Sequence, residues 1–84
     1  MGWRKQLKAN ISGAANNGSG LIRVTAPNHR FQTGNHINIT SVGGCVEANA
    51  NHWTITVITA NTFDLQGSTF TNAYTSGGIA ARKD

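Results

Sequence analysis

The centre of the chain, residues 29–49, reads HRFQTGNHINITSVGGCVEAN. Within it, Ile37 and Ile39 alternate with polar residues, which is the two-residue period of a strand with one buried and one wet face. A wide turn with Gly34 at a positive φ precedes this strand, and a double glycine ends it. The stretch therefore predicts a turn, a half-buried strand and a corner that carries Cys45, the only cysteine.

The same alternation predicts further strands on both sides of this centre, at residues 21–26, 52–58, 63–65 and 79–81. A hairpin turn joins two of them at residues 59–62. A long polar loop at residues 66–76 holds Phe70 and Tyr74, two aromatic side chains that need cover. About five or six short strands separated by turns predict an all-β fold, a small antiparallel β-barrel with an N-terminal arm. We expect the sheet to close into a barrel, because a closed barrel leaves no exposed edge strands and so small a sheet could not otherwise protect them.

The beginning of the chain predicts less regular structure. We expect residues 1–20 to form a basic arm and a Gly/Asn-rich loop, and residues 21–84 to form the barrel. Residues 3–12 alternate like an edge strand, but Trp3 and Leu7 lie four apart and also fit a helix. Residues 13–20, GAANNGSG, have the composition of a flexible loop. The arm is expected either to move independently or to fold back as a strand.

Composition places the chain among ordered, β-rich domains with a small core. Only 12% of its 84 residues are charged and the net charge is +4, whereas roughly 25% of an average domain is charged. Abundant Ile, Val and Thr argue against disorder. A domain this small has a marginal core, and a lone cysteine cannot form an internal disulfide. We therefore expect self-association, with a trimer as one arrangement, or docking on a larger assembly.

The cysteine and the histidines do not resemble a reactive site. A nucleophilic cysteine needs a base or a helix N-terminus to lower its pKa, and no motif here marks one beside Cys45. We expect it to be small, buried and inert. His29, His36 and His52 are spaced too widely for a zinc pair and are interpreted as turn and surface residues. No metal ligand or cofactor-binding residue is predicted.

The acidic residues are few and have structural interpretations. Glu47, Asp64 and Asp84 are the three acids of the chain. Glu47 is expected to accept hydrogen bonds in a loop, and Asp64 to occupy the wet position of its strand. Hydrolytic chemistry with paired carboxylates is not indicated. We predict no catalytic residue and no enzymatic activity.

Several short motifs occur in one order along the body. They are His29-Arg30-Phe31-x-x-Gly34-Asn35-x-Ile37, then Val42-x-Gly44-x-Val46-Glu47-x-Asn49, Trp53-x-Ile55-x-Val57, Asn61-Thr62-Phe63-x-Leu65 and Phe70-x-x-x-Tyr74-x-x-Gly77-Gly78. In this order they resemble the first catalytic-cysteine half-domain (FCCH) of ubiquitin-activating enzymes, over about residues 21–80. Arg30, Asn35, Cys45 and Ala48 depart from the pattern of that module. The resemblance implies a small, accessory β-barrel. The 84 residues hold no nucleotide-binding glycine loop and are too few for an adenylation domain.

Modules of this pattern also resemble repeats in tail, fibre and head-associated proteins of bacterial viruses. That resemblance implies a non-enzymatic virion protein that decorates or cements the capsid, or joins head and tail components. Its implied partners are other virion proteins, and its implied location is the virion, assembled in the host cytoplasm. A tail-fibre or baseplate accessory module is an alternative, and the residues do not distinguish these positions. No membrane-spanning or secretory segment is expected.

The contact residues are expected at the margins of the barrel. Basic residues near both ends can steer the protein to an acidic surface, and aromatic residues dominate interface energies. The candidates for partner binding are Trp3, Arg4, Lys5, Leu7, Lys8, Ile11, Phe70, Tyr74, Arg82 and Lys83. Nucleic-acid binding through the same basic termini is the rival function, although the polar faces of the strands carry no aromatic residues.

Overall fold

The structure is a computed structural model that describes residues 7–83. It contains seven strands and one short 3₁₀ helix: β1 (Lys8–Asn10), β2 (Gly13–Asn16), β3 (Ile22–Thr25), β4 (His36–Gly43), η1 (Val46–Ala48), β5 (Ala50–Thr59), β6 (Thr62–Leu65) and β7 (Ser76–Arg82). The strands form one sheet in the order β1-β7-β4-β5-β6-β3-β2. Every neighbouring pair is antiparallel. The all-β prediction is confirmed.

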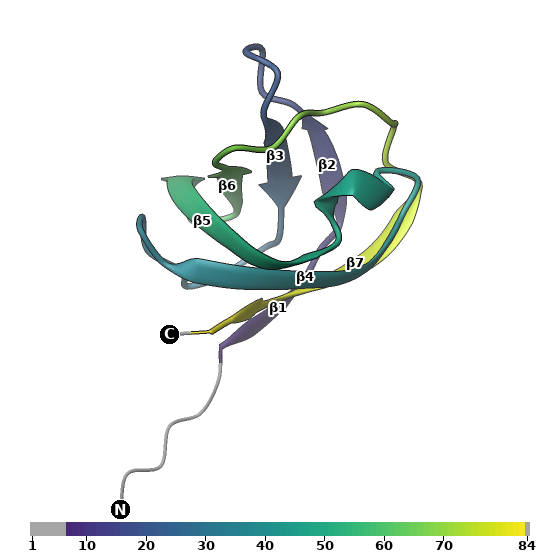
Figure 1. The fold of residues 1–84 in the computed structure, drawn as a ribbon. Coiled ribbons are helices and arrows are strands. Elements are labelled where there is room, and N and C mark those ends of the chain that lie inside the picture. The colour runs from purple at the N-terminus through teal and green to yellow at the C-terminus, as the bar shows by residue number, and fades with distance from the viewer. Residues whose placement is uncertain (1–6, 84) are drawn as a thin grey trace, which may run out of the picture.

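The sheet curls into a half-barrel (Figure 1), which corrects both the predicted strand count of five to six and the predicted closed barrel. β1 and β2 are consecutive in the chain, yet they lie at opposite ends of the sheet. Between them, the Ile11 N–H donates to the Gly78 carbonyl at 2.9 Å and the Ser12 N–H donates to the Thr25 carbonyl at 2.8 Å. A single bent segment therefore bonds to both ends of the sheet and brings them together.

Residues 13–16 correct the prediction of a flexible loop. They form β2, which pairs along its whole length with β3, from Gly13 opposite Thr25 to Asn16 opposite Ile22. The small side chains of GAAN carry no apolar period, so the strand is specified by its partner and not by its own sequence. The alternative that the arm folds back as a strand is confirmed for β1 and β2. Residues 3–6, with Trp3, Arg4 and Lys5, lie outside the described residues.

The core lies on the concave side of the half-barrel. Ile22, Val24, Ile37, Phe63 and Leu65 are each completely buried, as the alternation predicts. In β4 a strict two-residue period would point Ser41 inward after Ile37 and Ile39. Ser41 instead adopts φ 65°, and this local irregularity shifts the phase so that Val42, 4% exposed, enters the core.

Candidate interaction surface

Four basic side chains gather on the convex side of the sheet, at the end where β1 and β4 begin and β7 ends. Ala9, Ile37 and Ala80 point into the core, so their neighbours point outward by the two-residue period of strands. Lys83 follows β7 directly, and its N–H donates to the His36 carbonyl at 2.8 Å. We call this surface the outer basic face; it consists of Lys8, His36, His52 and Lys83.

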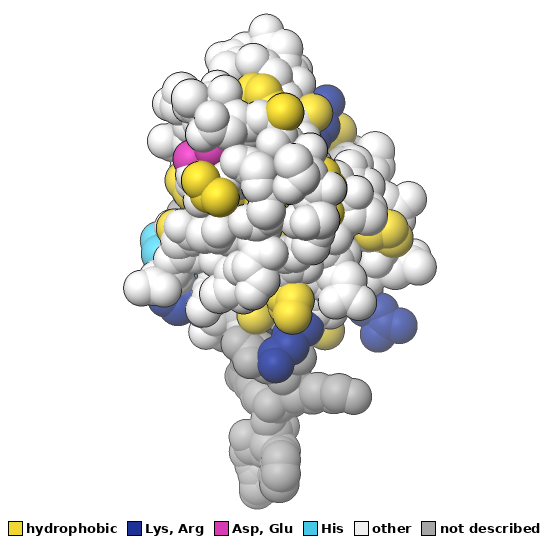
Figure 2. All heavy atoms as spheres, turned by 90° about the vertical axis from the view of Figure 1, so that its right-hand side faces the viewer, with side chains coloured by type: hydrophobic (Ala, Val, Ile, Leu, Met, Phe, Trp, Pro, Cys, Tyr) yellow, Lys and Arg dark blue, Asp and Glu magenta, His cyan; other side chains and the backbone are white. Residues whose placement is uncertain are grey.

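The register of the strands makes this face continuous. Lys8 lies opposite Ala81, and β7 in turn pairs with β4. The Lys83 side chain reaches across to β5, where its Nζ donates to the Asn51 carbonyl at 2.7 Å. Figure 2 shows most of the visible lysine and arginine side chains towards one end of the molecule. The face therefore draws on β1, β4, β5 and the residue that follows β7, and so it joins the two ends of the described chain to its middle.

His36 and His52 lie in ring contact within this face. His36 is opposite Thr54, so His52, two residues before Thr54, is its diagonal neighbour on the same side of the sheet. The two imidazoles stack with centroids 4.6 Å apart and an interplanar angle of 25°. His52 is exposed and His36 is half-buried. The sequence interpretation of surface histidines fits these two, but their separation of sixteen residues gave no sign of the contact.

The other predicted partner-binding residues are less accessible. Leu7, Phe70 and Tyr74 are partly buried and pack against the core, and Ile11 is 5% exposed. The Tyr74 hydroxyl donates to the Gly77 carbonyl at 2.9 Å and lies 3.3 Å from the Ile11 carbonyl. Arg82 is half-buried. The partner-binding role of these residues stays a prediction, while Lys8 and Lys83 are the exposed described members of the predicted set.

Glu47 serves as the acceptor that holds the loop before β7. Its Oε2 accepts the Thr71 and Asn72 N–H groups, each at 2.7 Å, and its Oε1 accepts the Asn72 side-chain amide at 3.1 Å. Burial raises the pKa of Glu47, but these hydrogen bonds outweigh it and lower the pKa to about 2. The prediction of a hydrogen-bond acceptor is confirmed. This carboxylate fastens a loop and is not placed to transfer protons near neutral pH.

Cys45 is buried, as predicted, with no exposed surface. Its Sγ lies 3.4 Å from Glu47 Oε2 and donates to it. Burial first, and the Glu47 carboxylate second, raise the pKa of the thiol to about 11. A nucleophilic cysteine requires the opposite shift. The site around Cys45 is therefore unsuited to thiolate chemistry.

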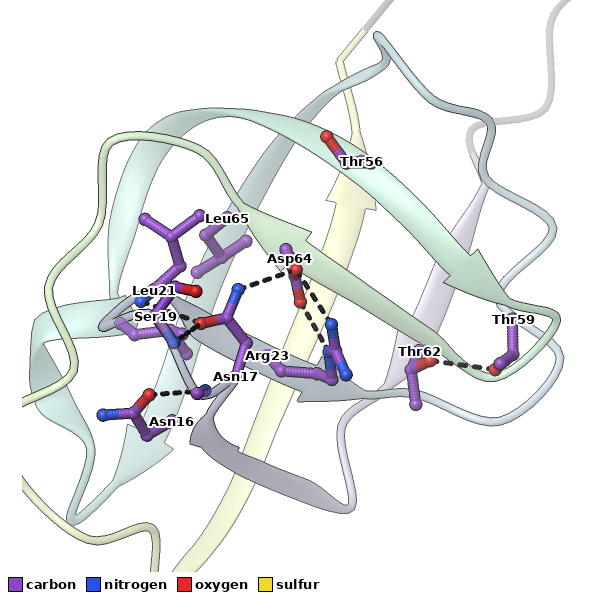
Figure 3. A network of polar contacts seen from close by, with 12 residues as sticks. Asn16, Asn17, Ser19, Leu21, Arg23, Thr56, Thr59, Thr62, Asp64 and Leu65 are labelled. Carbon is purple, nitrogen blue, oxygen red and sulfur yellow. Dashed lines mark hydrogen bonds and ion pairs between the residues drawn. The ribbon is translucent and has the colours of Figure 1, made fainter.

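Of the two acids in the described residues, Glu47 and Asp64, it is Asp64 whose predicted environment is wrong. It was expected in the wet position of its strand, yet it is 6% exposed. Figure 3 shows the reason: Arg23 on β3 and Asn17 both point at its carboxylate. Arg23 Nε donates to Oδ1 at 2.7 Å and Asn17 Nδ2 donates to Oδ2 at 2.9 Å. Arg23 lowers the pKa of Asp64 most strongly, with Asn17 adding to the effect against the opposing influence of burial.

His29 lies apart from the other histidines and is part of the core. It is 2% exposed, stacks on Phe31 at 5.3 Å and meets Phe63 edge-on at 5.2 Å. Its Nδ1 accepts the Phe31 N–H, and its Nε2 lies 3.1 Å from the Thr59 carbonyl. Both ring nitrogens are thus engaged. In residues 7–83 there is no group of three or more His, Cys, Asp or Glu residues arranged to hold a metal ion.

Within the described chain, no helix has the length and apolar character needed to cross a membrane.

Comparison with known proteins identifies one matching family. The sequence profile of the ubiquitin-activating enzyme E1 FCCH domain matches residues 17–83. No curated protein matches the chain. The matched span begins after β2 and includes every strand from β3 to β7.

Proposed function

The chain belongs to the E1 FCCH domain family, and from this premise we propose that it is a non-enzymatic binding module of a bacteriophage particle. The FCCH domain is a small β module and not a catalytic domain. In our proposal the half-barrel decorates or cements the capsid, or joins head and tail components, through protein–protein contacts. Its partners are other virion proteins, and it acts as an oligomer in the virion.

The observation that carries the proposal is that the described acids and the cysteine make contacts within the fold, whereas two lysines stay exposed to solvent. Glu47 holds a loop, Asp64 pairs with Arg23, and Cys45 is buried with a raised pKa. Lys8 and Lys83 remain exposed on the outer basic face, and Arg4 and Lys5 precede Lys8 in the sequence. A surface with this charge favours fast association with an acidic partner. The described residues of this face offer no arrangement of acid, base and nucleophile for catalysis.

Immunogold labelling of purified virus particles tests the proposal that the protein is part of the virion. Particles are banded by density from the lysate in which the protein is made, and the protein is located with gold-labelled antibody raised against the recombinant chain. We expect label at a repeated position on intact particles. Recovery of the protein only in the soluble fraction, with unlabelled particles, would contradict the proposal. The position of the label separates capsid decoration from a tail-fibre or baseplate role.

Nucleic-acid binding is the second candidate, favoured by the outer basic face itself. Sequence-independent binding to phosphates weakens steeply as salt rises. Binding of single-stranded DNA that is tight and lost between about 50 and 200 mM salt would support this alternative. The aromatic rings of the described residues argue against it. Phe31 and Phe63 are core residues, while Trp53, Phe70 and Tyr74 pack against the core, so they do not form an exposed platform for bases.

A further inference from the structure

We propose that the outer edge of β2 pairs with β2 of a second copy of the chain, so that the two sheets join across a two-fold axis. This inference rests on the proposed function, in which the protein acts as an oligomer, and it names the contact between the copies. β2 stands at one end of the sheet and, among the described strands, pairs with β3 alone. An edge of this kind is a template for a further strand.

The hydrogen-bonding groups on this edge belong to Ala14 and Asn16. The Asn17 N–H donates to the Leu21 carbonyl at 2.9 Å, which fixes the phase of the ladder between β2 and β3. In an antiparallel ladder, residue pairs that exchange hydrogen bonds alternate with pairs that do not. Ala15, two residues before Asn17, therefore also bonds to β3. Ala14 and Asn16 direct their N–H and carbonyl groups away from β3.

One register of two antiparallel β2 strands uses these groups and no others. It places Ala14 opposite Asn16 of the second copy, and each such pair exchanges both of its N–H···O bonds. A shift by two residues in either direction would need the N–H of Ser12 or of Gly18. The Ser12 N–H already donates to the Thr25 carbonyl at 2.8 Å. The Gly18 N–H already donates to Asn16 Oδ1 at 2.7 Å. The edge is therefore self-complementary, as a two-fold interface must be.

The side chains at this edge are small and uncharged, which suits contact between two copies of a cationic protein. Residues 9–22 contain no charged side chain, although the whole chain has a net charge of +4. Ala15 is exposed and meets its own copy at the two-fold axis. By contrast, β1 at the other end of the sheet is three residues long and begins with Lys8. Short length and a lysine are features that protect an edge strand from pairing.

The dimer leaves both outer basic faces open. Figure 1 shows the turn between β2 and β3 at one end of the molecule, and the start of β1 and the end of β7 at the other. Lys8 and Lys83 belong to the second end. Two joined copies therefore present two basic faces, which strengthens their binding to an acidic surface that repeats at a matching distance.

Cross-linking through one introduced cysteine tests the contact and its register. Ala15 and its copy form a pair without mutual hydrogen bonds, whose Cα atoms lie about 4.5 Å apart, and a disulfide can span this distance. Ala15→Cys should therefore form a covalent dimer under mild oxidation. Asn10→Cys is the matched control, because Asn10 is exposed on the other end strand. It should remain largely monomeric, and the native Cys45 is buried in both variants.

Ala15→Lys tests the same contact without a covalent bond. It places two lysines opposite each other at the axis, and like charges in this position destabilise a strand pair. Sedimentation equilibrium should give a dimer dissociation constant about fivefold or more above that of the wild-type protein. Ser19→Lys is the control, since it adds the same charge at an exposed residue of the turn, and it should leave the constant nearly unchanged. Urea unfolding checks that both variants are folded.

The outcomes separate this inference from the proposed function. A wild-type protein that stays monomeric or forms trimers would overturn the β2 contact, and so would faster cross-linking of Asn10→Cys than of Ala15→Cys. Equal dissociation constants for Ala15→Lys and Ser19→Lys would overturn it too. In each case, labelled particles would still support the virion proposal. Covalent dimers of Ala15→Cys together with unlabelled particles would support the contact and contradict the virion proposal.

Discussion

Several polar residues of this protein stabilise its fold through buried or loop-fixing contacts. Three of them show which side-chain environments can be predicted from the sequence and which cannot. Cys45 and Glu47 follow from local patterns, since a small apolar position and a loop acceptor are both visible in the Gly-Gly corner. Asp64 does not, because Arg23 and Asn17, which bury its carboxylate, come from segments more than forty positions away. The His36–His52 contact was missed for the same reason: cross-strand neighbours leave no fixed spacing in the sequence.

Cys45 should be unreactive in the folded protein. With a pKa of about 11, only about one thiol in a thousand is ionised at pH 8, and the side chain has no exposed surface. Labelling with an aromatic disulfide at pH 8 should be very slow in buffer and rapid in denaturant. Fast labelling of the folded protein would show that the pocket opens or that the thiol is activated.

Glu47→Gln should destabilise the protein and flatten its response to acid. The variant weakens charge-assisted hydrogen bonds to Thr71 and Asn72, at a cost of about 1–2 kcal/mol for a partly exposed group. The folded pKa of Glu47 is lowered from 4.5 to about 2, so its contribution is complete above the unfolded value and is lost as pH falls towards the folded one. Urea unfolding at about pH 6 and pH 3 measures both effects.

The comparison between wild type and variant isolates Glu47, because Asp64 also has a lowered pKa and contributes to acid sensitivity in both proteins. The difference in unfolding free energy between them should shrink as the pH falls. A constant difference at all pH values would mean that the carboxylate charge plays no part in holding the loop.

At the scale of elements, alternation predicts the central strands and fails at the margins. β3, β4, β5 and β6 carry an apolar side chain at every second position over most of their length, whereas β7 was expected from the short apolar run at residues 79–81. Each of the five was expected within a few residues of its observed bounds. β2 lacks that pattern, so composition suggested a loop. Its pairing with β3 is a tertiary interaction that overrides weak local preference. The half-barrel shape likewise depends on how β1 and β2 meet the ends of the sheet.

Substitution of Gly44 tests whether the corner between β4 and η1 requires a glycine. Gly44 has φ 77°, and a Cβ there would collide with the backbone of Ala73 and Thr75. Gly44→Ala should therefore cost roughly 3 kcal/mol or more, through strain as well as collision. Gly18 is the matched control: it has φ 99° but open space around the added atom, so Gly18→Ala should cost only about 1 kcal/mol.

Thermal or urea unfolding of both glycine variants measures the difference. Equal costs at the two positions would show that the loop near Ala73 moves freely away from the corner. That result would also weaken the role assigned to Glu47, since its hydrogen bonds to Thr71 and Asn72 are what fix the same loop.

At the scale of the whole molecule, a small core and a cationic convex face point to function in an assembly. A domain of this size buries only roughly 60% of its unfolded surface, which is the basis for expecting an oligomer. We expect sedimentation equilibrium to show self-association at micromolar concentrations, with a melting temperature that rises with protein concentration. A stable monomer with a high melting temperature independent of concentration would remove this basis.

The role of the outer basic face in assembly is the central claim, and incorporation into particles tests it most directly. Cells making particles produce the wild-type protein and the Lys8→Glu/Lys83→Glu variant together, and mass spectrometry measures the ratio of the two in purified particles and in the lysate. The account predicts that particles contain about tenfold less variant, relative to wild type, than the lysate does, consistent with roughly 1.4 kcal/mol of lost binding. Equal ratios in particles and lysate, or particles that contain neither protein, would contradict it.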